Sequence, residues 1–143
     1  MQVETHSFDR SYEAGPESVA RVRADVAMFA AAEGLESTLV DDIRLAVSEA
    51  ATNAVMHGYR GASGTVHATA GIAGDAMWIS ISDLGRGMHS RPIATGMGLG
   101  LALIGRLVSD LSVTPQPHGG TDVRMRFDLV PAGVPTHRHA LVA

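Results

Sequence analysis

Two pairs of neighbouring strand-like segments constrain the fold of this chain most. Residues 65–72 and 77–83 alternate apolar and polar side chains, and residues 74–75 between them read Gly-Asp, a pair typical of hairpin turns. Two more strand-like segments, 111–114 and 121–130, follow one another nearer the C-terminus. Strands that come in adjacent pairs indicate a mixed or antiparallel sheet.

Helical spacing separates these strands from one another. Residues 18–33 and 37–56 repeat apolar side chains every three or four positions, and a third helix is expected at about 99–108. A first strand is expected within 2–10. This order predicts an α+β fold, a two-layer sandwich with a mixed or antiparallel sheet and helices on one face.

The chain of 143 residues suits one domain, which we place at residues 1–130, with a flexible C-terminal tail at 131–143. No apolar run approaches the roughly 18 residues of a membrane span, and the N-terminus does not resemble a signal peptide. The net charge of −4 argues against direct binding to nucleic acid. We therefore expect a cytoplasmic protein that has neither a membrane nor a nucleic acid as partner.

The chain contains neither cysteine nor lysine, and all 11 of its basic residues are arginines. The absence of cysteine excludes disulfides, a thiolate nucleophile and cysteine-ligated metal centres. The absence of lysine excludes a Walker A phosphate loop and a lysine Schiff base.

A polar ladder is predicted on the second helix. Glu49, Asn53 and His57 are spaced four residues apart, so they share one face of a helix, about 6 Å apart along its axis. Such a ladder can carry chemistry, but by itself it is more often the solvated face of a helix.

Glycines follow a carboxylate at the end of the strongest strand. Asp83 closes that strand and is followed by Gly85 and Gly87. Aspartate and glycine are also ordinary turn residues, so a simple turn explains this segment by itself equally well.

A second group of glycines, at positions 96, 98 and 100, opens the third helix around Leu99. Glycines let backbone N–H groups approach an anion, and the N-terminus of a helix adds a partial positive charge. The spacing differs from G-x-G-x-x-G, and no clean βαβ unit surrounds it, so a Rossmann site is a poor match.

Taken together, these motifs resemble the ATP-binding fold shared by gyrase, Hsp90, histidine kinases and MutL, which is called the GHKL or Bergerat fold. The matching segments, in chain order, are 49–58, 83–87, 96–101 and 119–121. The resemblance covers nearly the whole chain, from the first strand to about residue 130.

Within that fold the chain is most similar to the anti-sigma-factor serine/threonine kinases. Residues 45–54 look very like theirs, and the domain stands without a dimerisation helix pair or a phosphoacceptor histidine segment. The segment between the two glycine motifs, 88–95, is shorter than the lid that is usual in histidine kinases or gyrase.

The resemblance implies ATP and Mg²⁺ as cofactors. It makes Glu49 the catalytic residue, which acts as general base toward an incoming serine hydroxyl or orients it. It makes Asn53 the Mg²⁺ ligand and Asp83 the acceptor for the adenine amino group. The cofactor-binding residues that it implies are Asn53, His57, Asp83, Gly85, Gly87, Gly96, Gly98, Leu99, Gly100 and Thr121.

The resemblance also implies a function. The chain would sequester an alternative sigma factor and phosphorylate a serine or threonine of an anti-anti-sigma antagonist of the STAS type. A homodimer is also expected from the resemblance. Two alternatives stay open: an ATP-binding regulator that binds proteins without phosphotransfer, and a kinase that acts on another regulatory partner. The presence of Glu49 favours a kinase, because a pure binding protein needs no base there.

Overall fold

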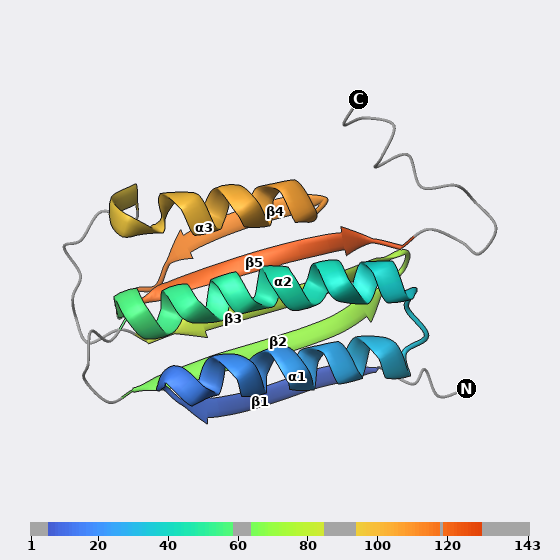
Figure 1. Ribbon diagram of the computed structural model, residues 1–143, viewed down its shortest axis with the longest axis horizontal. Helices are drawn as coiled ribbons and strands as arrows, with labels where there is room; N and C mark the ends of the chain where they lie inside the picture. The colour runs from blue at the N-terminus through green and yellow to red at the C-terminus, as the bar shows by residue number, and fades with distance from the viewer. Residues whose placement is uncertain (1–5, 59–63, 85–93, 118, 130–143) are drawn as a thin grey trace.

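A computed structural model describes residues 6–58, 64–84, 94–117 and 119–129 of the chain. Within these residues, three α-helices cover one face of a five-stranded sheet (Figure 1). The strands lie in the order β1-β2-β3-β5-β4, and every neighbouring pair is antiparallel. The predicted α+β sandwich with helices on one face is confirmed, and the sheet is antiparallel rather than mixed.

The strands are β1 (Ser7–Glu13), β2 (Thr65–Ala73), β3 (Ala76–Asp83), β4 (Asp110–Pro115) and β5 (Thr121–Asp128). Their period-two pattern buries alternate residues against the helices, as at Met77, Ile79 and Ile81 of β3. Gly74 makes the predicted β2–β3 hairpin turn with a φ of +63°. β1 extends beyond the predicted segment to Glu13, because residues 7–13 pair along their whole length with β2.

The helices are α1 (Pro16–Ala32), α2 (Ser37–Asn53) and α3 (Ala94–Leu107), with a π-helical turn, η1 (Ala54–Gly58), directly after α2. α1 begins two residues earlier than expected, because proline is accepted at the first position of a helix, where its missing N–H would be unpaired. The N-cap of α2 is Glu36.

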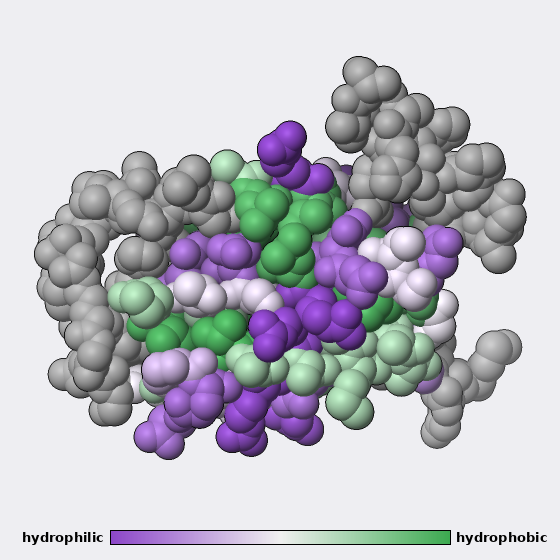
Figure 2. Space-filling view, viewed as in Figure 1, coloured by the Kyte–Doolittle hydropathy of each residue, from purple (hydrophilic) through white to green (hydrophobic). Residues whose placement is uncertain are grey.

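α2 is the central helix of its layer and contacts both α1 and α3 (Figure 1). The buried residues of α2 therefore lie around most of the helix rather than along a single stripe, and they include Val40 and Ala51 as well as Ile43 and Val47. Viewed from the helix side, hydrophilic residues gather along the edge formed by α1 and β1 (Figure 2). Hydrophobic residues gather in the upper middle of this view, over α3, whereas hydrophilic and hydrophobic residues are mixed over α2.

A polar tie joins α1 to the edge strand β1. The hydroxyl of Tyr12 donates to Asp25 Oδ2 at 2.8 Å, and Arg10 Nη1 donates to the same oxygen at 2.9 Å. Burial raises the pKa of Tyr12 far above its ordinary value, and the hydrogen bond to Asp25 raises it further. This phenol consequently stays protonated in the folded protein.

The predicted boundary between a domain at 1–130 and a tail at 131–143 remains a prediction, because residues 130–143 lie outside the described part of the chain. The predicted short segment 88–95 lies partly outside it as well. Its last two residues, Ala94 and Thr95, belong to the first turn of α3.

Candidate functional site

The polar ladder of α2 leads to a buried asparagine. Asn53 is the last residue of α2 and is only 6% exposed. Its side-chain Nδ2 atom is buried and has no hydrogen-bond partner within the described residues. A buried amide donor without a partner costs about 1–3 kcal/mol. A polar ligand that accepted a hydrogen bond there would offset this cost.

Glu49 lies one α-helical turn before Asn53 and is half-buried. Because α-helical geometry holds through Asn53, the two side chains start from the same face of α2. The structure therefore brings a carboxylate and an amide together near the C-terminal end of the central helix.

The third member of the ladder follows a different geometry. Residues 54–58 form the π-helical turn η1, whose i→i+5 hydrogen bonds make it wider than an α-helical turn. The prediction that His57 continues the α-helical ladder is therefore wrong for the backbone, and the side chain of His57 lies outside what the structure describes. Short π-turns occur often at functional sites.

Asp83 reaches the same end of the molecule from the sheet. It is the last residue of β3 and is 5% exposed. The alternation of β3 places it on the helix-covered side, in line with Ile79 and Ile81. β3 contacts both α2 and η1, and the C-terminal ends of α2 and β3 lie at one end of the sandwich (Figure 1).

Thr121 opens β5 beside the end of β3 and is half-buried. The register confirms this neighbourhood, because Asp122 pairs with Ser82. The residue before Thr121, Gly120, touches the main chain of Asp83 so closely that a Cβ atom would overlap the Asp83 carbonyl oxygen. The end of β3 that carries Asp83 is therefore in direct contact with the turn that leads to Thr121.

The second glycine group lies inside a helix rather than before it. α3 begins at Ala94, so Gly96, Gly98, Leu99 and Gly100 belong to its first two turns, and the expected start near Leu99 is wrong. The N-terminal end of α3 lies at the same end of the sandwich as the ends of α2 and β3 (Figure 1). The side chain of Leu99 is not described, and Gly85 and Gly87 lie outside the described residues.

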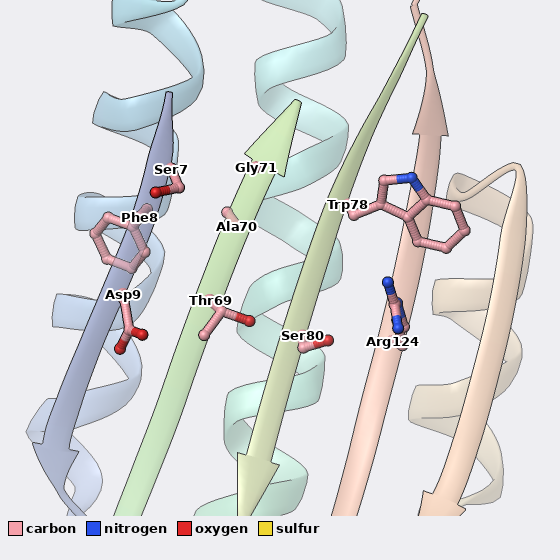
Figure 3. A pocket seen from close by; sticks show the side chains of 9 residues that line it. All are labelled: Ser7, Phe8, Asp9, Thr69, Ala70, Gly71, Trp78, Ser80 and Arg124. Carbon is pink, nitrogen blue, oxygen red and sulfur yellow. The ribbon is translucent and has the colours of Figure 1, made fainter. Parts of the chain in front are cut away.

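A cavity of about 240 Å³ lies elsewhere, on the sheet face opposite the helices (Figure 3). Thr69, Gly71 and Ser80 lie between the edge strand β1 on one side and Trp78 with Arg124 on the other. The Arg124 guanidinium lies 4.7 Å from the centre of the Trp78 ring. Among the predicted site residues whose side chains the structure describes, none of Glu49, Asn53, Asp83 and Thr121 lines this cavity.

Asp122, on this open sheet face, has a carboxyl group whose pKa is changed by folding. Burial raises the pKa of Asp122 above its ordinary value, while the nearby charges of Arg124 and His67 oppose this change. His67 itself bonds to Asp9 through Nε2 at 2.7 Å. The ionised form of Asp122 is thus disfavoured by folding.

The described residues fit a magnesium site in which the nucleotide supplies most of the ligands and the protein supplies few. Mg²⁺ often takes only one or two protein oxygens and completes its shell with phosphates and water. Asn53 can supply such an oxygen, because its side-chain amide carries an oxygen acceptor beside the nitrogen that has no partner among the described residues. No group of three histidine, aspartate or glutamate side chains able to hold a metal exists among the described residues.

The contact made by Gly120 is the part of the site that the sequence did not reveal. The Gly-Gly pair at 119–120 indicates a turn, and both residues have positive φ. Nothing in the pattern shows that this turn meets a strand end that lies 37 positions earlier in the chain.

No helix in the described part of the chain is both long and apolar enough to cross a membrane.

Comparison with known proteins identifies the family. The model of the histidine kinase-like ATPase domain matches residues 12–127. The chain is 34% identical over 123 residues to the anti-sigma F factor of Clostridium acetobutylicum, which covers 77% of this chain and 83% of that protein. It is also 34% identical over 116 residues to the anti-sigma F factor of Thermoanaerobacter sp. strain X514, covering 72% of this chain and 80% of the relative.

A third relative is matched over a longer stretch. The anti-sigma F factor of Clostridium beijerinckii is 32% identical over 130 residues, which covers 80% of this chain and 90% of that protein. The family match spans β1 to β5 and includes the ends of α2 and β3 where Asn53 and Asp83 are buried. The chain belongs to the histidine kinase-like ATPase domain family, and its relatives include proteins named anti-sigma F factor.

Proposed function

We propose that this protein is an ATP-dependent anti-sigma factor kinase. It binds Mg-ATP, holds an alternative sigma factor in an inactive complex, and phosphorylates a serine or threonine of an anti-anti-sigma antagonist of the STAS type. The observation that carries the proposal is the buried amide nitrogen of Asn53, which has no hydrogen-bond partner among the described residues. It lies one turn from Glu49, at the same end of a histidine kinase-like ATPase fold as Asp83. The relatives named anti-sigma F factor support the choice of partners.

The residues divide the work according to their chemistry. Asp83 accepts a hydrogen bond from the adenine amino group, with Thr121 beside it at the start of β5. Asn53 offers its amide oxygen to the magnesium ion, which when bound neutralises phosphate charge. The glycines of α3 and the N-terminal end of that helix favour binding of the nucleotide's phosphate groups. His57, Gly85, Gly87 and Leu99 keep their predicted roles as parts of the nucleotide site.

Glu49 is placed to accept the proton of the partner's serine or threonine hydroxyl. The hydroxyl oxygen of the partner's serine or threonine forms a bond to the γ-phosphorus, the bond from that phosphorus to ADP breaks, and the hydroxyl proton passes to Glu49. A half-buried carboxylate suits this role, because it is shielded from bulk water and still reachable by a protein partner.

We also propose that the protein acts in the cytoplasm, in a transcriptional response to stress, and that it forms a homodimer. The dimer is tested by sedimentation equilibrium of the purified chain across a concentration series. A mass equal to one chain at every concentration would exclude it.

The test of the function is phosphotransfer. The purified protein is incubated with Mg-ATP and a candidate STAS protein, and the partner is analysed for phosphoserine and phosphothreonine by mass spectrometry. We expect transfer by the wild type and by Glu36→Ala, which changes an exposed carboxylate at the other end of α2, and a loss of at least 100-fold in Glu49→Ala.

Sigma binding is measured on the same three proteins and should be equal in all of them. If the wild type binds both ATP and a sigma factor but transfers phosphate to no STAS partner, the kinase part of the proposal is wrong. Equal transfer by Glu49→Ala would instead remove Glu49 from the mechanism.

A further inference from the structure

Gly120 is the point at which the turn before β5 meets the end of β3. Its φ is +90°, a backbone conformation that residues with side chains rarely adopt. A Cβ atom on Gly120 would overlap the carbonyl oxygen of Asp83 and would lie 2.6 Å from the carbonyl carbon of Leu84. Both neighbours are main-chain atoms, so they cannot turn aside as a flexible side chain could. Only glycine permits this contact.

Two other glycines show that the contact, and not the backbone angle, distinguishes Gly120. Gly34 and Gly74 also have positive φ, at +86° and +63°. A Cβ atom at either position would have no atom within 4 Å. Substitution of these glycines therefore adds the strain of a positive φ, whereas substitution of Gly120 adds the same strain and a collision with β3.

The turn that carries Gly120 is anchored on both sides. Gln116 N donates to Gly120 O at 3.0 Å, and Gly119 N donates to Gln116 O at 3.1 Å. Directly after the turn, Thr121 pairs with Pro115 of β4, and the next residue of β5 pairs with β3. The turn thus has little freedom to move away from Asp83.

We propose that Gly120 is a positioning residue of the nucleotide site. Its missing side chain lets its main chain lie against the main chain at Asp83 and Leu84, and this contact fixes the buried Asp83 carboxylate for its hydrogen bond to adenine. The inference rests on the proposed binding of ATP. It adds a second determinant of base selectivity, one that acts through Asp83 and does not touch the base.

The test compares Gly120→Ala with Gly34→Ala and Gly74→Ala as matched controls. The affinities of the full-length proteins for Mg-ATP and Mg-GTP are measured by isothermal titration calorimetry. Because a displacement of about 1 Å in a positioned group can cost up to 100-fold, we expect Gly120→Ala to bind ATP at least tenfold more weakly. We also expect its preference for ATP over GTP to fall at least tenfold, while both controls match the wild type.

The ratio of the two affinities separates positioning from a general loss of structure. A merely structural defect lowers the affinities for ATP and GTP together, whereas a displaced Asp83 weakens the one contact that tells them apart. Gly120→Ala with an unchanged ATP-to-GTP ratio, whatever its affinity for ATP, would overturn the proposal.

A second variant covers the case in which Gly120→Ala does not fold. Replacing Gln116 by its α-hydroxy acid removes the N–H that bonds to Gly120 O and adds no atoms near Asp83. We expect this ester variant to lose at least about twofold in the ATP-to-GTP ratio, because the turn loses one of the hydrogen bonds that hold Gly120 beside Asp83. An unchanged ratio in this variant would likewise overturn the positioning role.

Failure of the proposed function gives a different result. If the wild type binds no ATP, the nucleotide proposal fails as a whole and takes the positioning role with it. If the wild type binds ATP in preference to GTP and both the Gly120 and the Gln116 variants do so equally well, only the positioning role fails.

Discussion

The buried amide of Asn53 leads to a prediction in which stability and function change in opposite directions. Leucine is close to asparagine in shape and carries no polar atom. Asn53→Leu therefore removes a buried donor that has no partner within the described residues, at a site that is 6% exposed. The cost of such a donor is about 1–3 kcal/mol, and leucine is also the better helix former.

We expect Asn53→Leu to raise the free energy of unfolding of the ligand-free protein by about 1–2 kcal/mol. For a domain of this size, each 1 kcal/mol moves Tm by about 3–5 °C. Differential scanning calorimetry and urea denaturation of the ligand-free protein measure the change independently.

Ser18 provides the matched control, because it is a buried polar residue whose hydrogen bonds are made. It is 3% exposed, its Oγ donates to Gly15 O at 2.6 Å, and Gly15 N donates back to Oγ at 3.2 Å. Ser18→Ala should lower the free energy of unfolding by about 1 kcal/mol, because it leaves the two main-chain groups of Gly15 without this partner.

Addition of Mg-ATP should then raise the Tm of Ser18→Ala but not that of Asn53→Leu. A ligand at 100 times its Kd stabilises a protein by about 2.7 kcal/mol, so the wild type and Ser18→Ala should both show a large upward shift of Tm. Asn53→Leu should show little or none. The reasoning is refuted if Asn53→Leu is less stable than the wild type without ligand, or if Mg-ATP stabilises it as much as the wild type.

Three further predictions concern carboxylates and a phenol. Asp83→Asn should lower the preference for ATP over GTP, measured by competition with a labelled nucleotide; an unchanged preference would remove Asp83 from base recognition. Burial raises the pKa of Asp122, so the folded protein holds the proton of this carboxyl more tightly than the unfolded chain does. Ionisation of Asp122 therefore lowers the free energy of unfolding as pH rises above about 4. Asp122→Asn should raise Tm at pH 7, and this gain should vanish in acid. Because the pKa of Tyr12 is raised in the folded state, stability should fall as pH rises above about 10, where a phenol of the unfolded chain ionises, and Tyr12→Phe should lose about 1 kcal/mol at pH 7 but show a weaker alkaline decline. A wild-type alkaline decline identical to that of Tyr12→Phe would contradict this assignment.

The sequence predicted those parts of the fold that depend on local periodicity. Alternation in β2 and β3 and the helical spacing of α1 and α2 are repeated many times, so the layers and the strand pairs followed from them. The start of α3 did not, because each glycine costs a helix about 1 kcal/mol and the glycine-rich residues before Leu99 look like a loop. Tertiary contacts override that local preference.

In the candidate site, too, local sequence patterns predicted some features, while others depend on contacts between distant segments. Spacing placed Glu49 and Asn53 on one face of α2, and the strand pattern ended at Asp83. The π-turn after Asn53 and the contact of Gly120 with Asp83 depend on how distant segments pack, so neither has a signature in a short stretch of sequence. The burial of Asn53 likewise follows from the central place of α2 between its two neighbouring helices.

The central claim is that the end of the sandwich formed by Asn53, Asp83 and Thr121 binds Mg-ATP. Isothermal titration calorimetry of the wild type with ATP and GTP, each in magnesium and in EDTA, tests it most directly. We expect ATP to bind in magnesium, to bind at least tenfold more weakly in EDTA, and to be preferred to GTP at least tenfold. Absence of ATP binding in magnesium, or equal affinity for the two nucleotides, would contradict the claim.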